Sequence, residues 1–414
     1  MKKGILFFLL FIIFFNAQAQ KSNRLLAGAS SAPVNPPVNS FIAGDKQNRR
    51  FAGVHDDLFA KAVVITNNNN SVALLTVDCI GLLYPQLMQI RKEVKKALPE
   101  FPVNQIILSS THTHSGPDVV GVWGPDLMHS GVDSSYIRML VNIAAQQIVN
   151  AYRNRLPVQA TYAITTYGED WVENISQPGE TDRSVTILQL ENKKKKNIAT
   201  LTNFACHPTF LDGINDKVSA DYVAGYYELL NKKQGGVNMF LQGSIGGWVQ
   251  PEHEPRTFEA AAKRGGGLAE AVLIALKNKK EIQGDELIFR SKQLNIPLTN
   301  PGFKQLSAMG VIKREFTDSV LTEIAWFSVG NAVFATHPGE TVPAMSLATK
   351  TMMQTNGPKF ILGLSMDALG YILKPEFFDA EKKIPHSEYL CSMSVGIETM
   401  AFIIKALGSL SKNE

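Results

Sequence analysis

Two histidines separated by one residue are the side chains best placed to form a metal site. His112 and His114 belong to a Thr-His-Thr-His-Ser-Gly-Pro stretch, directly after residues 103–108, whose apolar run predicts a buried strand. Side chains alternate along an extended chain, so histidines two positions apart point to the same side. Two imidazoles at a rigid strand end can supply two metal ligands, or one ligand and a general base. The alternative is a pair of loop histidines satisfied by neighbouring groups.

Three later strand ends carry side chains of compatible chemistry. His207 follows a predicted strand and precedes a proline, Glu340 follows a Pro-Gly turn, and Tyr371 follows an Asp-Ala-Leu-Gly loop. Each also has a structural interpretation: a satisfied core histidine, a helix N-terminal carboxylate and a packing tyrosine. Together with His112 they offer two imidazoles, a carboxylate and a phenol, which would form a zinc shell with room for water.

The elements that must position these side chains mix strands with helices. Strands are expected at 60–66, 71–77, 103–108, 185–190, 198–204, 237–241, 286–296 and within 321–336. Helices are expected at 85–98, 136–152, 222–232, 258–277, 345–353 and 392–407. This density predicts an α/β fold, with a single large domain whose mixed β-sheet core is flanked by helices. That domain should cover residues 51–414, after a loop-rich entry segment over residues 20–50.

The N-terminus and the charge limit location and partners. Two lysines, an apolar run over residues 5–15 and an Ala-Gln-Ala site at 17–19 predict a signal peptide over residues 1–19. We therefore expect export, to the periplasm or outside the cell, and no transmembrane span in the mature chain. A formal net charge of +4 argues against nucleic acid as a partner. The three cysteines predict no disulfide framework.

Several blocks of sequence resemble one enzyme family. They are Thr-His-Thr-His-Ser-Gly-Pro at 111–117, Phe-Ala-Cys-His-Pro-Thr at 204–209, Ser-Ala-Asp-Tyr at 219–222, Pro-Gly-Glu at 338–340 and Gly-Tyr at 370–371. In order and spread the chain resembles the catalytic domain of the neutral/alkaline, non-lysosomal ceramidase family. The first block is the most specific, and the blocks span nearly the whole mature chain.

The resemblance implies a role for each of these residues. The zinc (Zn²⁺) ligands would be His112, His207, Glu340 and Tyr371. His114 would be the catalytic base beside the metal, which would activate a bound water and polarise an amide carbonyl. Asp221, and less directly Asp78, would orient a ligand imidazole from behind. Tyr389 is the nearest counterpart of a second family tyrosine close to the substrate.

The chain also departs from the family pattern. The family carries a serine facing the metal, and Val249 stands at that position; Ser244, five residues earlier, could replace the serine only in a rebuilt loop. The family's substrate-binding arginine is also missing, because the block reads Asn-Ile-Ser-Gln at 174–177. We expect no C-terminal β-sandwich domain after the 392–407 helix. The simplest remaining mechanism is direct attack by zinc-bound hydroxide, with no acyl-enzyme.

Three functions are compatible with these residues. The first is an exported zinc-dependent amidohydrolase that cleaves an N-acyl, sphingolipid-like or other small substrate, with transient contact to a membrane surface. The second is a zinc-dependent esterase or lactonase, suggested by the missing serine and arginine. The third is a non-catalytic relative that retains the metal.

Overall fold

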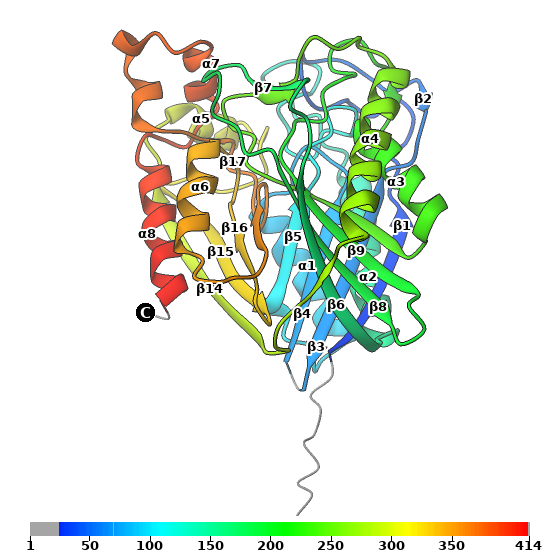
Figure 1. Cartoon of the computed structure of the whole chain (residues 1–414). Helices are drawn as coiled ribbons and strands as arrows, with labels where there is room; N and C mark the ends of the chain where they lie inside the picture. Colours follow the sequence, from blue (N-terminus) through cyan, green and yellow to red (C-terminus); the bar gives the residue numbers. More distant parts are fainter. Residues whose placement is uncertain (1–24, 69, 413–414) are drawn as a thin grey trace, which may run out of the picture.

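The computed structural model describes residues 25–68 and 70–412. The predicted signal peptide over residues 1–19 lies outside these residues. The largest element of the fold is one mixed sheet of nine strands, with helices on both sides (Figure 1). The strand order is β11 (Val237–Gln242), β9 (Asn197–Phe204), β8 (Ser184–Asn192), β6 (Leu156–Thr166), β1 (Leu26–Pro33), β3 (Phe59–Asn67), β4 (Asn70–Val77) and β5 (Ile106–Ser110), with β13 (Lys280–Glu281) beside β6.

The sheet curls back on itself, so that its two ends meet. The hydroxyl of Thr76 on β4 donates to the carbonyl of Phe240 on β11, at 3.2 Å. Two helices, α1 (Tyr84–Ala97) and α2 (Ser134–Arg153), pack on one half of the sheet, and α3 (Tyr222–Gln234) and α4 (Phe258–Leu276) pack on the other. The α/β class and the large mixed sheet flanked by helices are confirmed.

The first glycine of the run within α4 is explained by helix packing. A Cβ atom on Gly265 would lie 1.8 Å from the carbonyl oxygen of Tyr222, and one on Gly225 would lie 2.5 Å from that of Ala262. Only glycine permits this approach of α3 and α4, so it outweighs the low helix propensity of the residue.

A second sheet covers one side of the first. It has the order β14 (Leu287–Pro297), β15 (Ser319–Val329), β16 (Ala332–Thr336) and β18 (Lys359–Leu362). Its outer face packs under α6 (Pro343–Met352) and α8 (Thr399–Lys412) and forms a smaller hydrophobic cluster. Shorter elements complete the fold: α5 (Pro301–Ala308), α7 (Ser387–Ser392), and the strand pairs β2 (Gly53–Val54) with β10 (Lys217–Val218), β7 (Val172–Asn174) with β12 (Val249–Pro251), and β17 (Glu340–Thr341) with β19 (Tyr371–Ile372).

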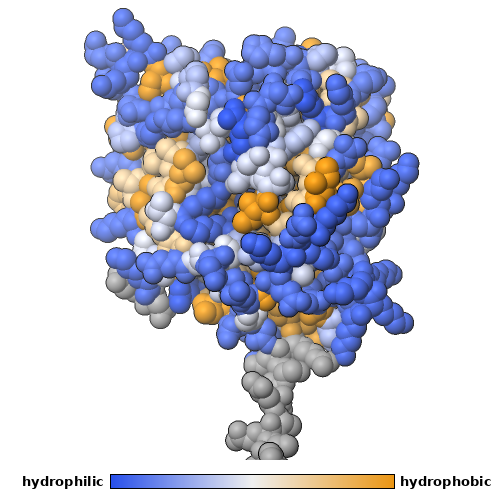
Figure 2. Space-filling view, in the orientation of Figure 1, coloured by the Kyte–Doolittle hydropathy of each residue, from blue (hydrophilic) through white to orange (hydrophobic). Residues whose placement is uncertain are grey.

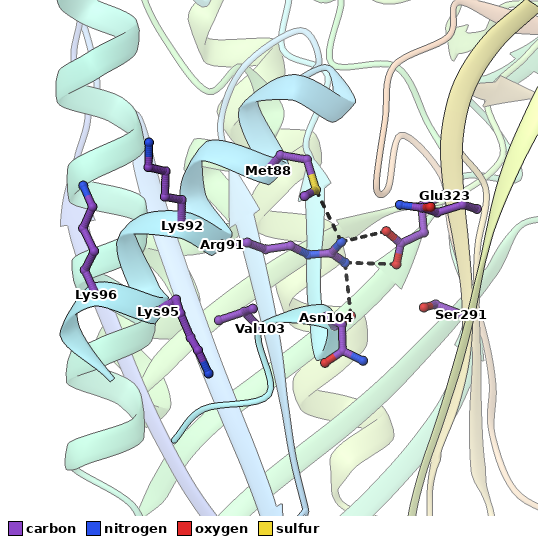
Figure 3. A pocket seen from close by; sticks show the side chains of 10 residues that line it. Met88, Arg91, Lys92, Lys95, Lys96, Val103, Asn104, Ser291 and Glu323 are labelled. Carbon is purple, nitrogen blue, oxygen red and sulfur yellow. Dashed lines mark hydrogen bonds and ion pairs between the residues drawn. The ribbon is translucent and has the colours of Figure 1, made fainter. Parts of the chain in front are cut away.

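A buried ion pair joins helix α1 to the second sheet. Arg91 reaches from α1 to Glu323 on β15, with nitrogen–oxygen distances of 2.7 and 3.1 Å (Figure 3). Both residues are less than 9% exposed and lie at a groove of about 790 Å³ between α1 and the β14–β15 hairpin. Because an unpaired buried charge is costly, this pair holds the second sheet against α1.

Two local predictions were wrong. The segment over residues 20–50 is not wholly loop-rich, because it contains β1, which pairs with β3 along its full length. The helix expected at 392–407 is broken between α7 and α8. The backbone N–H groups of Thr299 and Asn300 donate to the carbonyl of Val395, and the Asn300 side chain donates to Ser392 and Ser394. These bonds occupy carbonyls that a continuous helix would use itself.

The surface is mainly polar. Hydrophilic side chains cover most of the face in Figure 2, and hydrophobic ones form separate patches. Over residues 25–412, residue 69 aside, no helix combines the length and apolar character that crossing a membrane requires.

Candidate metal centre

His112 enters the centre from the loop after β5 in an unusual conformation. Its φ is +70°, which is uncommon outside glycine. Its backbone N–H donates to the Cys79 carbonyl, and its Nδ1 lies 2.5 Å from the Ile80 carbonyl oxygen. Because Nδ1 faces an acceptor, it carries the ring proton, and the lone pair of Nε2 points into the centre.

His207, at the end of β9, is held in the same way. Its backbone N–H and its Nδ1 both face the carbonyl oxygen of Val249, at 2.8 and 2.9 Å. Its Nε2 lies 3.0 Å from Oε2 of Glu340, which is also 3.5 Å from Nε2 of His112. Burial lowers the pKa of His207, as expected for a ring that stays neutral in the core.

Glu340 and Tyr371 are neighbours across a short parallel ladder. The β17–β19 register pairs them directly, so their side chains leave the same face. Burial alone would raise the pKa of Glu340, but His112 and His207 more than offset burial and hold that pKa well below its usual range. Burial raises the pKa of Tyr371, whose hydroxyl accepts a hydrogen bond from the Trp248 indole at 2.8 Å.

His114 reaches the same centre from its more open side. Its Nε2 lies 3.3 Å from Nε2 of His112, and its Nδ1 lies 3.2 Å from Oδ2 of Asp212, close enough for an ion pair although not aligned for a hydrogen bond. The His114 side chain is 16% exposed, against 5% for His112 and 2% for His207. Burial lowers the pKa of His114, but the surrounding carboxylates, led by Asp212, raise it to a net value above normal.

The arrangement fits a metal cation. One ring nitrogen from each of His112, His114 and His207 lies within 4.8 Å of the other two. Since Nδ1 of His112 and of His207 each faces a backbone carbonyl, the Nε2 lone pairs of these two rings point towards the Glu340 carboxylate, and Nε2 of His114 lies 3.3 Å from that of His112. Neutral imidazole and carboxylate oxygen are the ligands that divalent transition metals prefer, and the backbone carbonyls behind His112 and His207 fix the coordinating tautomer of these two rings.

An apolar cavity of about 110 Å³ adjoins this centre. His112 and Glu340 stand in its wall. The remaining wall is mainly hydrophobic and includes Val122, Trp123 and Phe303. A hydrophobic group in this cavity would therefore lie directly beside the converging ligands.

The predicted supporting residues are placed differently from expectation. Neither Asp221 nor Asp78 contacts a ligand imidazole, because backbone carbonyls hold those rings. Asp221 caps α3 and accepts the backbone N–H of Leu211, so it shapes the loop after β9. Tyr389 is half exposed, with its ring 6.3 Å from that of Tyr371, and lies at the edge of the centre.

Asp212 is the residue that sequence reasoning missed. Its position five residues after His207, in the same loop, was an available signal. Position alone could not show that its carboxylate turns towards His114, because that depends on how the loop folds over α3.

No serine in the predicted loop faces the ligands. Ser244 is buried, and its hydroxyl lies 2.8 Å from that of Thr341 and 3.5 Å from His337. Val249 is also buried, and its carbonyl supports His207. The loop therefore contributes backbone support for a ligand and offers no nucleophilic side chain to the centre.

Comparison with known proteins gives the family. Residues 36–241 match the family model described as neutral/alkaline non-lysosomal ceramidase, N-terminal. The chain belongs to the neutral/alkaline non-lysosomal ceramidase family. The matched segment contains His112, His114 and His207, whereas Glu340 and Tyr371 lie beyond it.

Relatives and solved structures agree with this assignment. Neutral ceramidase B of Dictyostelium discoideum is 27% identical over 210 residues, which is 44% of this chain and 28% of the relative. Neutral ceramidase of Drosophila melanogaster is 24% identical over 224 residues, which is 49% of this chain and 31% of the relative. The matches thus span less than a third of these curated relatives.

The structural likeness extends over almost the whole chain. The crystal structure of neutral ceramidase from Pseudomonas aeruginosa gives a TM-score of 0.78 at 15% identity, covering 94% of this chain and 74% of that one. A second structure, titled ceramidase complexed with C2, gives 0.75 at 14% identity, covering 94% and 75%. At such identities the likeness establishes the fold.

Proposed function

We propose that this protein is an exported, zinc-dependent hydrolase that cleaves the amide bond of an N-acyl, lipid-like substrate. The observation that carries the proposal is the convergence of three imidazole nitrogens and the Glu340 carboxylate beside an apolar cavity. The ligands would be His112, His207, Glu340 and Tyr371. Zinc bound there would polarise the amide carbonyl and make water more acidic.

Side chains of the protein would transfer the proton from the attacking water to the leaving group. His114 is the most open of the three histidines and lies next to a carboxylate, which suits a general base. It would take a proton from the attacking water at Nε2 and pass it to the leaving nitrogen. Asp212 would hold the Nδ1 side of the ring and stabilise the imidazolium. Because the Ser244 hydroxyl is hydrogen-bonded to Thr341 and a valine side chain has no nucleophilic atom, water would be the nucleophile.

We assign the apolar cavity to the acyl side of the substrate. It adjoins the carboxylate and one imidazole, so an acyl chain within it would place its carbonyl carbon at the centre. The family matches support a lipid-like amide, since the relatives are named ceramidases.

The proposal is tested by metal analysis of the purified mature protein together with hydrolysis of a fluorogenic N-acyl sphingosine, with and without a chelator. We expect about one zinc per chain, turnover that the chelator abolishes, and loss of both in His112→Ala. Absence of stoichiometric zinc, or full activity in His112→Ala, would refute the proposal. Mass spectrometry of the exported protein should find cleavage after Ala19.

A second candidate keeps the centre and changes the bond to an ester or lactone. The absence of a serine nucleophile at the centre favours it, because esters are hydrolysed more readily than amides. A panel of matched amide and ester substrates separates the two, and zinc without any turnover would indicate a non-catalytic binding protein.

A further inference from the structure

One loop connects the apolar cavity to the surface of the protein. We define the 118–131 loop as residues 118–131, between β5 and α2. Val122 and Trp123 of this loop form part of the cavity wall, beside His112 and Glu340. A few residues further on, the same loop reaches its exposed tip.

The tip of the 118–131 loop presents two aliphatic side chains to solvent. Leu127 is 62% exposed and Met128 is 58% exposed. They lie at the centre of a tight turn in which Oδ1 of Asp126 accepts the Met128 N–H at 2.7 Å and faces Nδ1 of His129 at 2.8 Å. Such Asx turns normally carry polar residues at the tip, so two adjacent large aliphatic residues are unusual there.

The base of this loop is firmly held. The buried carboxylate of Asp118 accepts the backbone N–H groups of Val120, Gly121 and Trp123 at 2.6–3.0 Å. The two aliphatic side chains are therefore carried on an ordered base, and burying them in a partner would require little further ordering of the loop.

A second loop brings another exposed aliphatic side chain to the same end of the molecule. Ile214 is 62% exposed and lies two residues after Asp212, which contacts His114. Arg49 donates to the carbonyl of Asn215 in this loop, and the adjacent Asn48 donates its backbone N–H to Gly124 of the 118–131 loop. The segment over residues 48–49 thus bridges the two loops, and their exposed side chains flank the metal centre.

We propose that Leu127 and Met128, assisted by Ile214, insert shallowly into a lipid surface and place the entrance of the apolar cavity on it. The partner is a lipid surface because the loop that lines the apolar cavity, which we assign to an acyl chain, also carries two adjacent exposed aliphatic side chains at its tip, an arrangement that suits shallow insertion. An acyl chain leaving the lipid would pass from the tip to Val122 and Trp123 and then into the cavity. This inference rests on the proposed function for its lipid-like substrate.

The test measures flotation of the full-length mature protein with phosphatidylcholine vesicles. We compare the wild type, the double variant Leu127→Asp/Met128→Asp, and the control Ile274→Asp. Ile274 is also 62% exposed but lies on α4, away from the two loops. Burial of two aliphatic side chains predicts that the double variant binds vesicles about tenfold to a hundredfold more weakly, while the control stays within about twofold of the wild type.

Several outcomes would overturn the proposal. These are wild-type protein that does not float with the vesicles, equal binding of the double variant, or an equal loss in the Ile274→Asp control. Binding that appears only on phosphatidylserine vesicles and survives the double substitution would also overturn it, because surface lysines would then explain the attraction. Unchanged thermal stability and zinc content confirm that the variants are folded.

Activity separates this proposal from the proposed function. The double variant should hydrolyse a soluble short-chain N-acyl substrate like the wild type, but a vesicle-embedded one at least tenfold more slowly. Vesicle binding that depends on Leu127 and Met128, with no hydrolysis of any substrate, would support the surface and refute the proposed function. Hydrolysis of the substrates without vesicle binding that depends on Leu127 and Met128 would support the proposed function and refute the lipid-binding surface.

Discussion

Zinc should stabilise this protein measurably, and removing one ligand should remove most of that stabilisation. Ring nitrogens of three histidines and one carboxylate converge in the core, so a cation that binds there favours the folded state. Zinc buffered at about 1,000 times its Kd contributes about 4 kcal/mol to the free energy of unfolding. The entropy of unfolding is about 2.1 cal/mol/K per residue, or about 0.8 kcal/mol/K for a chain of this length. Dividing the first quantity by the second gives a rise in Tm of about 5 °C.

The His112→Ala variant should lose more than half of the zinc-dependent rise in Tm. If the lost ligand weakens zinc binding by about 100-fold, the same buffered zinc contributes about 1.4 kcal/mol, and the Tm rise falls to about 2 °C. The assay is differential scanning calorimetry in zinc buffer and in chelator. The matched control is His253→Ala, since the His253 side chain is 78% exposed and pairs only with Glu173 at the surface.

Two calorimetry results would contradict zinc binding at this centre. A zinc-dependent rise in Tm that is equal in the wild type and in His112→Ala would place the metal elsewhere. An equal loss of the rise in His112→Ala and in His253→Ala would show that surface histidines account for it.

Three further predictions address the mechanism and the fold. Asp212→Asn should lower kcat about tenfold to a hundredfold. It should also move the rising limb of the kcat–pH profile to lower pH, because loss of the carboxylate lowers the pKa of His114 and the neutral base then forms at lower pH. An unmoved profile would contradict the pairing of Asp212 with His114. Ser244→Ala should keep kcat within about threefold of the wild type, because its hydroxyl is buried against a threonine, whereas a serine nucleophile would make the variant inactive in steady-state assays. Glu323→Ala should lower the free energy of unfolding, measured by urea denaturation, by about 3–5 kcal/mol, because it leaves the Arg91 guanidinium buried without its ion-pair partner. The control Glu93→Ala, which removes a surface ion pair with Lys96, should lower it by less than about 1 kcal/mol.

Long periodic segments were predictable because their own sequence fixes which face is buried. The helix expected at 136–152 is α2, and its hydrophobic residues recur at helical spacing. The paired strands expected at 185–190 and 198–204 are β8 and β9. In each case local propensity and burial pattern agree with the final environment.

β1 could not be predicted in this way. Its sequence, Leu-Ala-Gly-Ala-Ser-Ser-Ala-Pro, is made of small residues with no alternation of polar and apolar character. Small side chains are needed because α2 lies very close: a Cβ on Gly28 would sit 2.1 Å from the carbonyl oxygen of Ala151. The pattern therefore reflects a tertiary contact, which the segment alone does not encode.

The sequence by itself determined which chemical groups the centre has. The His-Thr-His spacing, the histidine before a proline and the Pro-Gly-Glu turn all place ligand-type side chains at strand ends. The family pattern predicted the same residues, and it predicted that Val249 stands in place of the serine.

Only the tertiary structure decided how these groups meet. The β17–β19 ladder brings Glu340 beside Tyr371, and the loop after β9 turns Asp212 towards His114. Both contacts depend on long-range strand pairing and loop packing, whose free energy is shared among many residues. The partners of the ligand rings are backbone carbonyls, of Ile80 in one case, and every residue has a carbonyl. The sequence therefore does not reveal which carbonyl contacts each ring, because that depends on the folded structure.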